Sequence, residues 1–335
     1  MRHRVPVRRC LMTISSAVLL ISGAMAAVPG RIVFEREGAI YTVEADGTSE
    51  TKLSVTGVPA TLSHPAWLPD GRQIAFGALS WGEEAPAPGE KPSQRDTYQV
   101  CHIWTLRIGD SAAVRIAEVA PLPREPKYEI REIEWSADGT RIGFEVGTVL
   151  EETGNPDIRY YVVNRNGKGV MSSGSAAYDD SLQPRRRLHE ERSPDGKRLL
   201  QSRTLGDVDE LFISDTDGSN ACQLTHTASL RDTAVTNIWG GGVISGVWSP
   251  DGARVVFIPL MEGADYAWGG LFSVHADGSG QTRLGKDMYL VGDLPKAWSP
   301  DGKRLAYEDD GAIYVADFMS SPRKIATGHT PDWGP

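Results

Sequence analysis

Residues 297–307 read "AWSPDGKRLAY", and residues 247–257 read "VWSPDGARVVF". In both, a tryptophan leads into Ser-Pro-Asp-Gly and then into a short apolar run. Proline fixes φ and glycine supplies a positive φ, so the tetrapeptide predicts a tight turn between two strands. Related copies are "PAWLPDGRQIAF" from Pro65, "IEWSADGTRIGF" from Ile133 and "ERSPDGKRLLQS" from Glu191, where Arg192 replaces the tryptophan. The turn glycines are Gly71, Gly139, Gly196, Gly252 and Gly302.

A period of 50 to 68 residues between these glycines is typical of a propeller or a solenoid. The two ends of the chain complete a sixth copy. "PGRIVFEREGAIYTVEADG" at 29–47 aligns with "DGKRLAYEDDGAIYVAD" at 301–317, and "HTPDWGP" at 329–335 supplies the missing tryptophan and the start of the turn. A closed ring explains such a split, because the first and last strands then share one sheet.

Each repeat contains four short runs rich in Val, Ile, Tyr and Phe, separated by Asp-Gly, Asn-Gly or Pro turns. We therefore predict an all-β fold, a six-bladed β-propeller of four-stranded antiparallel blades closed by the N- and C-terminal segments in one blade. The predicted propeller is a single domain over residues 27–335.

The pattern W-S-P-D-G-K-R-[LIV]-A-[FY], followed by [LI]-[FY]-x-x-x-x-D-G-[ST]-x-x-x-x-L-T, resembles the repeats of the TolB-like family, also described as WD-like or Pro-Asp repeats. The resemblance covers residues 29–335 and implies a β-propeller in a periplasmic envelope protein. TolB carries an extra α/β domain before its propeller, and related peptidases carry a hydrolase domain after theirs. We expect neither domain in this sequence.

Residues 1–26 have the pattern of a secretory signal peptide: a basic start, a short apolar run and "AMA" at 24–26. We expect cleavage after Ala26 and export, most simply to the periplasm, with a retained anchor as the alternative. No later stretch is long and apolar enough to span a bilayer. Removing four arginines from the 35 basic residues leaves 31 against 44 acidic ones, a formal charge of about −13. That charge disfavours nucleic acid and anionic lipid as partners.

Cys101 and Cys222 remain after cleavage and lie in different repeats. An exported protein permits a disulfide, but two distant cysteines do not form a disulfide framework, and their redox state stays open. The five motif tryptophans recur once per blade, which favours packing between blades over ligand binding. The repeated aspartates are expected to form turns.

Nearly all the variation in the length of the connections falls at the end of the blades opposite the Ser-Pro-Asp-Gly turns. Functional residues on a rigid scaffold usually lie on such loops, so this end is the predicted binding face, with neutral insertions as the alternative. The first strand of each blade should start at this face and line a central channel. The candidate residues of the channel mouth are His64, Glu132, His189 and His329.

Histidines and a carboxylate around one channel mouth suit a transition metal or a substrate carboxylate, and the alternative is that they are ordinary polar residues lining the channel. Trp81, Trp239 and Trp268 lie beside glycines in the variable connections, where an exposed indole stacks on a sugar or a partner side chain, or on its own loop. The sequence names no cofactor and leaves a metal open.

No G-x-S-x-G, H-E-x-x-H, C-x-x-C or P-loop motif is present. We therefore expect a non-catalytic scaffold of the cell envelope that binds a protein or peptide, although catalysis stays open. The alternative is a carbohydrate-active propeller enzyme, a metal-assisted lyase or a glycoside hydrolase, with its site at the channel mouth and the loop tryptophans as saccharide platforms. Neither prediction includes nucleic acid as a partner.

Overall fold

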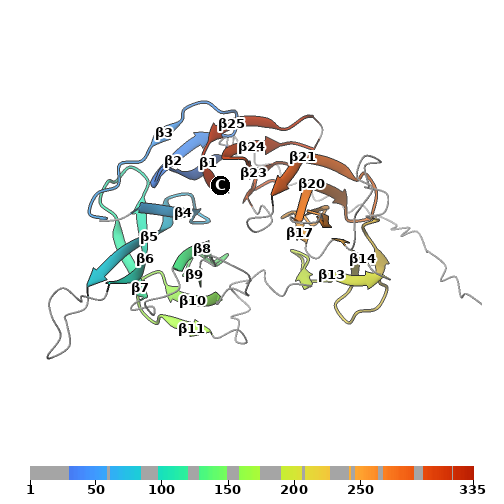
Figure 1. Ribbon diagram of the computed structural model, residues 1–335, viewed down its shortest axis with the longest axis horizontal. Helices are drawn as coiled ribbons and strands as arrows, with labels where there is room; N and C mark the ends of the chain where they lie inside the picture. The colour runs from blue at the N-terminus through green and yellow to red at the C-terminus, as the bar shows by residue number, and fades with distance from the viewer. Residues whose placement is uncertain are drawn as a thin grey trace, which may run out of the picture. The chain divides into compact units, whose positions relative to one another are not determined.

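Short strands joined by glycine turns make up the chain in the computed structural model, and the described residues contain no helix (Figure 1). The described part of the chain accordingly holds no helix with the length and hydropathy needed to cross a membrane. The structure describes residues 30–58, 61–83, 97–119, 128–148, 158–173, 190–205, 208–226, 241–242, 246–262, 267–289, 297–318 and 320–335. The predicted signal peptide, residues 1–26, lies outside these residues.

The chain divides into two compact units. One holds residues 29–184, 306–313 and 324–335, and the other holds residues 185–305 and 314–323 together with residues 1–28. The prediction of a single domain over residues 27–335 concerns how these units combine, and it stays a prediction.

Blade 1 pairs the two ends of the chain in one sheet, with strand order β26-β1-β2-β3 (Figure 1). Its strands are β26 (His329–Trp333), β1 (Arg31–Arg36), β2 (Ala39–Glu44) and β3 (Thr51–Lys52). Ile32 lies opposite Trp333, and Val33 lies opposite Asp332. The tight turn between β1 and β2 places Glu37 and Gly38 at φ values of 50° and 71°, as a two-residue hairpin turn requires.

Blades 2 and 3 belong to the same unit and pack face to face. Blade 2 consists of β4 (Thr61–Trp67), β5 (Gln73–Glu83), β6 (Thr97–Arg107) and β7 (Val114–Val119). Blade 3 consists of β8 (Tyr128–Trp135), β9 (Arg141–Thr148), β10 (Ile158–Asn164) and β11 (Met171–Ser173). Ile103, Ile130 and Phe144 are among the side chains buried between these blades, whereas Ile74 and Phe76 face blade 1. Residues 74–78 of β5 are buried on both faces, and they form a continuous apolar run in the sequence.

Blades 4 and 5 belong to the second unit and share one ten-stranded sheet. Blade 4 consists of β12 (Glu190–Arg192), β13 (Arg198–Leu205), β14 (Val208–Asp215) and β15 (Cys222–Gln223). Blade 5 consists of β17 (Gly246–Trp248), β18 (Arg254–Phe257), β20 (Ala267–His275) and β21 (Thr282–Tyr289). Two short strands, β16 (Gly241–Gly242) and β19 (Leu260–Glu262), link β14 to β20.

Blade 6 is a four-stranded sheet whose residues are divided between the two units. Its strands are β22 (Ala297–Trp298), β23 (Leu305–Asp309), β24 (Ala312–Ala316) and β25 (Arg323–Thr327). The structure thus contains six four-stranded blades of the β-propeller type, which confirms the predicted all-β fold class and the pairing of the two end segments. Closure of all six blades into a ring stays a prediction.

Candidate functional site

The end of each blade that carries the repeated turn, here called the turn end, satisfies its polar groups locally. Asp138 Oδ1 accepts hydrogen bonds from Ser136 Oγ at 2.6 Å and from the Thr140 backbone N–H at 3.0 Å. These hydrogen bonds lower the pKa of the Asp138 carboxyl to about 2, and the bond from the Ser136 hydroxyl has the largest effect. The same serine–aspartate bond recurs at Asp195, Asp251 and Asp301. The aspartates therefore form turns, as predicted.

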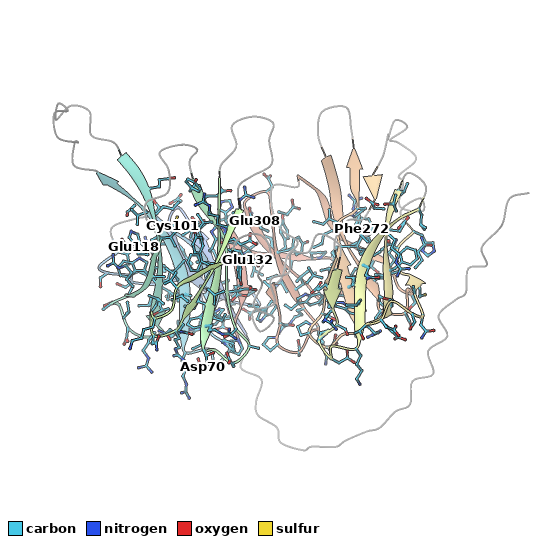
Figure 2. The ribbon with its side chains drawn as sticks, turned by 90° about the horizontal axis from the view of Figure 1, so that it is seen from below. Asp70, Cys101, Glu118, Glu132, Phe272 and Glu308 are labelled. Carbon is cyan, nitrogen blue, oxygen red and sulfur yellow. The ribbon has the colours of Figure 1, made fainter. Side chains whose placement is uncertain are left out.

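Four of the turn glycines, Gly71, Gly139, Gly252 and Gly302, also lie close to residues of the preceding blade. A Cβ atom added at Gly139 would lie 3.0 Å from Leu68 Cδ1, and one at Gly302 would lie 3.1 Å from Asp251 Cγ. A Cβ atom at Gly71 would lie 2.9 Å from Pro335 Cγ. These turns therefore contribute to the packing between adjacent blades. Figure 2 shows Asp70, from the turn of blade 2, at the lower edge of the molecule in this view.

The motif tryptophans join one blade to the next. Trp135 Nε1 donates to the Ala66 carbonyl of blade 2 at 3.2 Å, and Trp248 Nε1 donates to the Glu191 carbonyl of blade 4 at 3.4 Å. Arg198 lies over the Trp248 ring at 4.9 Å from its centroid. These contacts confirm the prediction that the repeated tryptophans pack between blades.

The opposite end of each blade, here called the loop end, contains backbone strain in two neighbouring first strands. His64 in β4 has a φ of 49° and Thr330 in β26 has a φ of 47°, and each precedes a proline. A residue before proline normally adopts an extended conformation, so both positions are unfavourable. The pairing register shifts at both places, which marks a bulge of the kind found near functional sites. The His64 side chain is half-buried at this bulge, and its role at a channel mouth stays a prediction.

His329 contacts a carboxylate that the sequence analysis did not select. Its Nδ1 lies 2.7 Å from Glu308 Oε1, and its side chain is half-exposed. The second oxygen of Glu308 accepts a hydrogen bond from the Thr330 backbone N–H at 3.3 Å. Glu308 therefore fixes both His329 and the strained residue beside it. The aligned runs "EREG" and "EDDG" were the only sequence signal for Glu308, and they marked a hairpin turn instead.

Glu132 lies with other acidic side chains on one face of blade 3. It is half-buried and lies opposite Glu145 across a bulge in β8. Tyr160 donates its hydroxyl proton to Glu134 Oε1 at 2.9 Å. Burial first, and then the nearby Glu134, Glu132 and Glu145 carboxylates, raise the pKa of Tyr160. Figure 2 shows Glu132 and Glu308 above the Asp70 turn.

The contacts described above do not test the predicted site as a whole. Within the described ranges, no group of three or more His, Cys, Asp and Glu side chains is arranged to hold a metal ion. His189 and Trp239 lie outside the described residues. Trp81 and Trp268 are placed by their backbones in β5 and β20, opposite Gln99 and Met261 respectively. The role of each of the seven predicted site residues, His329 included, therefore stays a prediction.

One polar group that the sequence analysis missed lies in blade 2, on three adjacent strands. Ser80 Oγ lies 2.8 Å from His102 Nε2, and His102 Nδ1 lies 3.7 Å from Glu118 Oε2. These residues share no local motif, because the register of β5, β6 and β7 alone places them side by side. The only sequence signal was a histidine in the apolar run "VCHIW".

No protein-family model matches the sequence, and no curated protein matches it. The fold is similar to that of TolB from Acinetobacter baumannii, at 16% identity over 91% of this chain and 67% of that chain, with a TM-score of 0.49. It is also similar to an oligogalacturonate lyase in complex with manganese (14% identity, 90% and 76% coverage, TM-score 0.41) and to an acylaminoacyl peptidase from Pyrococcus horikoshii (15%, 85% and 47%, 0.44). These likenesses concern the fold alone.

Proposed function

We propose that this chain is exported to the periplasm and serves there as a scaffold that binds a protein or peptide at the loop end of its blades. The observation that carries the proposal is the difference between the two ends. At the turn end, carboxylates and glycines already bond within their own turn or pack against the neighbouring turn. The loop end carries the two strained residues that precede prolines, His64 and Thr330, and the extended arm of blade 2, which leaves it available for recognition.

The extent of the strands in blade 2 supports this proposal. Among the described pairs, β4 pairs with β5 only up to Leu79, and β7 pairs with β6 only from Cys101 onward. Residues 80–83 and 97–100 continue as a two-stranded arm beyond those points. The outer edges of such an arm present N–H and C=O groups to which an extended peptide can add as a further strand.

One bond ties the base of this arm to blade 3. Gln99 Oε1 accepts a hydrogen bond from the Tyr128 backbone N–H at 2.6 Å. The arm is thereby held in place at its base, which lowers the entropy lost when a partner binds. The formal charge of about −13 after signal cleavage favours a basic segment as that partner.

The test is affinity capture from an envelope extract with the mature chain, residues 27–335, as bait. In the loop-end variant, Asn-Gly replaces residues 84–96, because Glu83 and Thr97 lie opposite each other and a two-residue turn can join them. A second loop-end variant combines Trp81→Ser with Trp268→Ser. The control carries Lys197→Glu and Lys303→Glu, which change exposed charges at the turn end.

We expect the wild-type chain and the control to capture the same protein, and we expect both loop-end variants to lose at least nine-tenths of it. Thermal unfolding midpoints equal to that of the wild type would show that the variants are folded. Capture that persists in both loop-end variants would contradict the proposed binding face. Capture of no specific protein by any bait would contradict the scaffold itself.

A further inference from the structure

Blade 2 carries a serine, a histidine and a glutamate in line across three strands. β5 supplies Ser80, β6 supplies His102 and β7 supplies Glu118, and in the ladder His102 lies opposite Glu118. Alternate residues of a strand share one face, so Ser80 and His102 project to the same side as Glu118. We propose that Ser80 is an activated nucleophile that takes up acyl groups from esters, with His102 as its base and Glu118 as the residue that positions His102.

The distances fit this assignment of roles. The Ser80 Oγ–His102 Nε2 distance of 2.8 Å is that of a hydrogen bond. The 3.7 Å between His102 Nδ1 and Glu118 Oε2 is longer, as is common for such groups before a substrate binds. A carboxylate beside Nδ1 favours the tautomer with its proton on that nitrogen, which leaves Nε2 free to accept the serine proton.

Burial separates the three roles. The His102 side chain is 8% exposed and Glu118 is 43% exposed, while Ser80 is half-buried and remains accessible to a small ester. Burial is the first cause of a lowered pKa for His102, so its imidazole is neutral at neutral pH and can act as a base. Trp104 flanks the imidazole, with ring centroids 6.5 Å apart, and limits water beside it.

The chemical steps balance with water as the only other reactant. Ser80 Oγ attacks the ester carbonyl carbon while its proton passes to His102 Nε2. The bond to the alkoxide leaving group then breaks, and that group takes the proton from Nε2. Water attacks the acyl carbon after giving a proton to Nε2, and Ser80 leaves with that proton, which releases a carboxylic acid.

The contact of Arg115 with Glu118 allows a test that distinguishes a catalytic role of Ser80 and His102 from a purely structural hydrogen bond. Arg115 Nη1 lies 2.6 Å from Glu118 Oε2, the oxygen that also faces His102. The guanidinium therefore competes with the imidazole for this carboxylate. Removing Arg115 should let Glu118 approach Nδ1 and increase the reactivity of Ser80.

The test measures covalent labelling of the mature chain by a fluorophosphonate probe, with peptide mapping of the labelled residue. In this reaction the serine oxygen forms a bond to phosphorus and fluoride is released to solvent. We expect labelling at Ser80 that is abolished in Ser80→Ala and reduced at least 10-fold in His102→Gln and Glu118→Gln. Glu118→Asp should recover part of the rate, and Arg115→Ala should raise it about 3-fold. Hydrolysis of p-nitrophenyl acetate should follow the same order.

The matched control is His275→Asn, which replaces a half-buried histidine of β20 in blade 5, near the Asp277 carboxylate, and should leave labelling unchanged. Because His102 is buried, its variant is interpreted only alongside Glu118→Gln, an exposed change whose thermal midpoint should equal that of the wild type. Absence of probe at Ser80 in the wild type would overturn the proposal. A labelling rate that is unchanged in both Glu118→Gln and Arg115→Ala would also overturn the proposal. Partner capture is a separate measurement, so either proposal can fail without the other.

Discussion

Single carboxylates fix the repeated turns. In blade 3, the Asp138 carboxylate accepts hydrogen bonds from the Ser136 and Thr140 hydroxyls and from the Thr140 amide. The Ser136 hydroxyl in turn accepts a hydrogen bond from the Arg141 N–H at 2.9 Å. All of these contacts lie within six residues of sequence. Because these hydrogen bonds are local, the turn could be predicted from its own amino-acid sequence.

The lowered pKa of Asp138 makes its contribution to stability dependent on pH. The pKa falls from 3.8 to about 2 in the folded chain, so the stabilisation is complete above about pH 4 and is lost as the pH falls toward 2. We expect Asp138→Ala to lower the thermal midpoint at pH 7 and to lower it much less at pH 2. Circular dichroism melts at several pH values measure this difference. A midpoint difference that stays constant down to pH 2 would contradict the assignment.

The two cysteines of the mature chain should differ in reactivity. Cys101 is fully buried and burial raises its pKa to about 12, whereas Cys222 is half-buried, and both are free thiols. A thiolate is the reacting species, so Cys101 should not react with Ellman's reagent at pH 8 in the folded protein. We expect one thiol to react before unfolding and two after it. Two rapidly reacting thiols in the folded chain would be the contrary result.

At the scale of strands, the bulge in β26 predicts an inverted order of substitutions. In an ordinary strand, glycine is less stable than valine by about 1 kcal/mol. At Thr330, with φ at 47°, a β-branched residue is strained by about 1–3 kcal/mol and glycine is not. We expect Thr330→Gly to be more stable to urea than Thr330→Val by about 1–2 kcal/mol.

A matched position in the same blade serves as the control for this order. Thr51 in β3 is exposed and has ordinary strand geometry, so Thr51→Val should be the more stable variant there. The same order at both positions would show that the strain at Thr330 is negligible. If Thr330→Gly is stabilising but weakens partner capture, the strain serves recognition.

Local sequence patterns also predicted the strands, but they did not predict which side chains contact each other between neighbouring strands. Hydrophobic runs and Asp-Gly turns placed the four strands of every blade, because both signals lie within about ten residues. The contact of His329 with Glu308 and that of Ser80 with His102 depend on strand register. Register is set by turns and bulges, and a shift of one residue moves a side chain to the other face. The predicted ligand set therefore paired His329 with other histidines and missed Glu308.

At the scale of the whole chain, the pairing of β26 with β1 predicts a strong dependence on residues 329–335. Trp333 is buried, the Trp67 backbone N–H donates to Asp332 Oδ2 at 2.6 Å, and the Gly334 N–H donates to the Arg31 carbonyl at 2.7 Å. Deleting these seven residues removes one strand and a tryptophan whose loss alone costs about 3–5 kcal/mol.

We expect the truncated chain to unfold at a thermal midpoint lower by at least 10 °C, or to be insoluble. Trp333→Phe is the graded comparison and should lower the midpoint by less, since it keeps the strand and most of the ring. Calorimetry measures both changes. A truncated chain with a wild-type midpoint would show that blade 1 does not need its fourth strand.

The same pairing also determines when blade 1 can be completed during synthesis of the chain. β1 and β26 are about three hundred residues apart, so at about 5–20 residues per second β1 is made roughly 15–60 seconds before its partner. During that interval, one edge of β1 is open to pairing with other chains, and the charged residues Arg31, Glu35 and Arg36 alone discourage such contacts. The first blade to leave the ribosome is thus among the last to be completed. A chaperone that binds an exposed strand edge has its longest opportunity there.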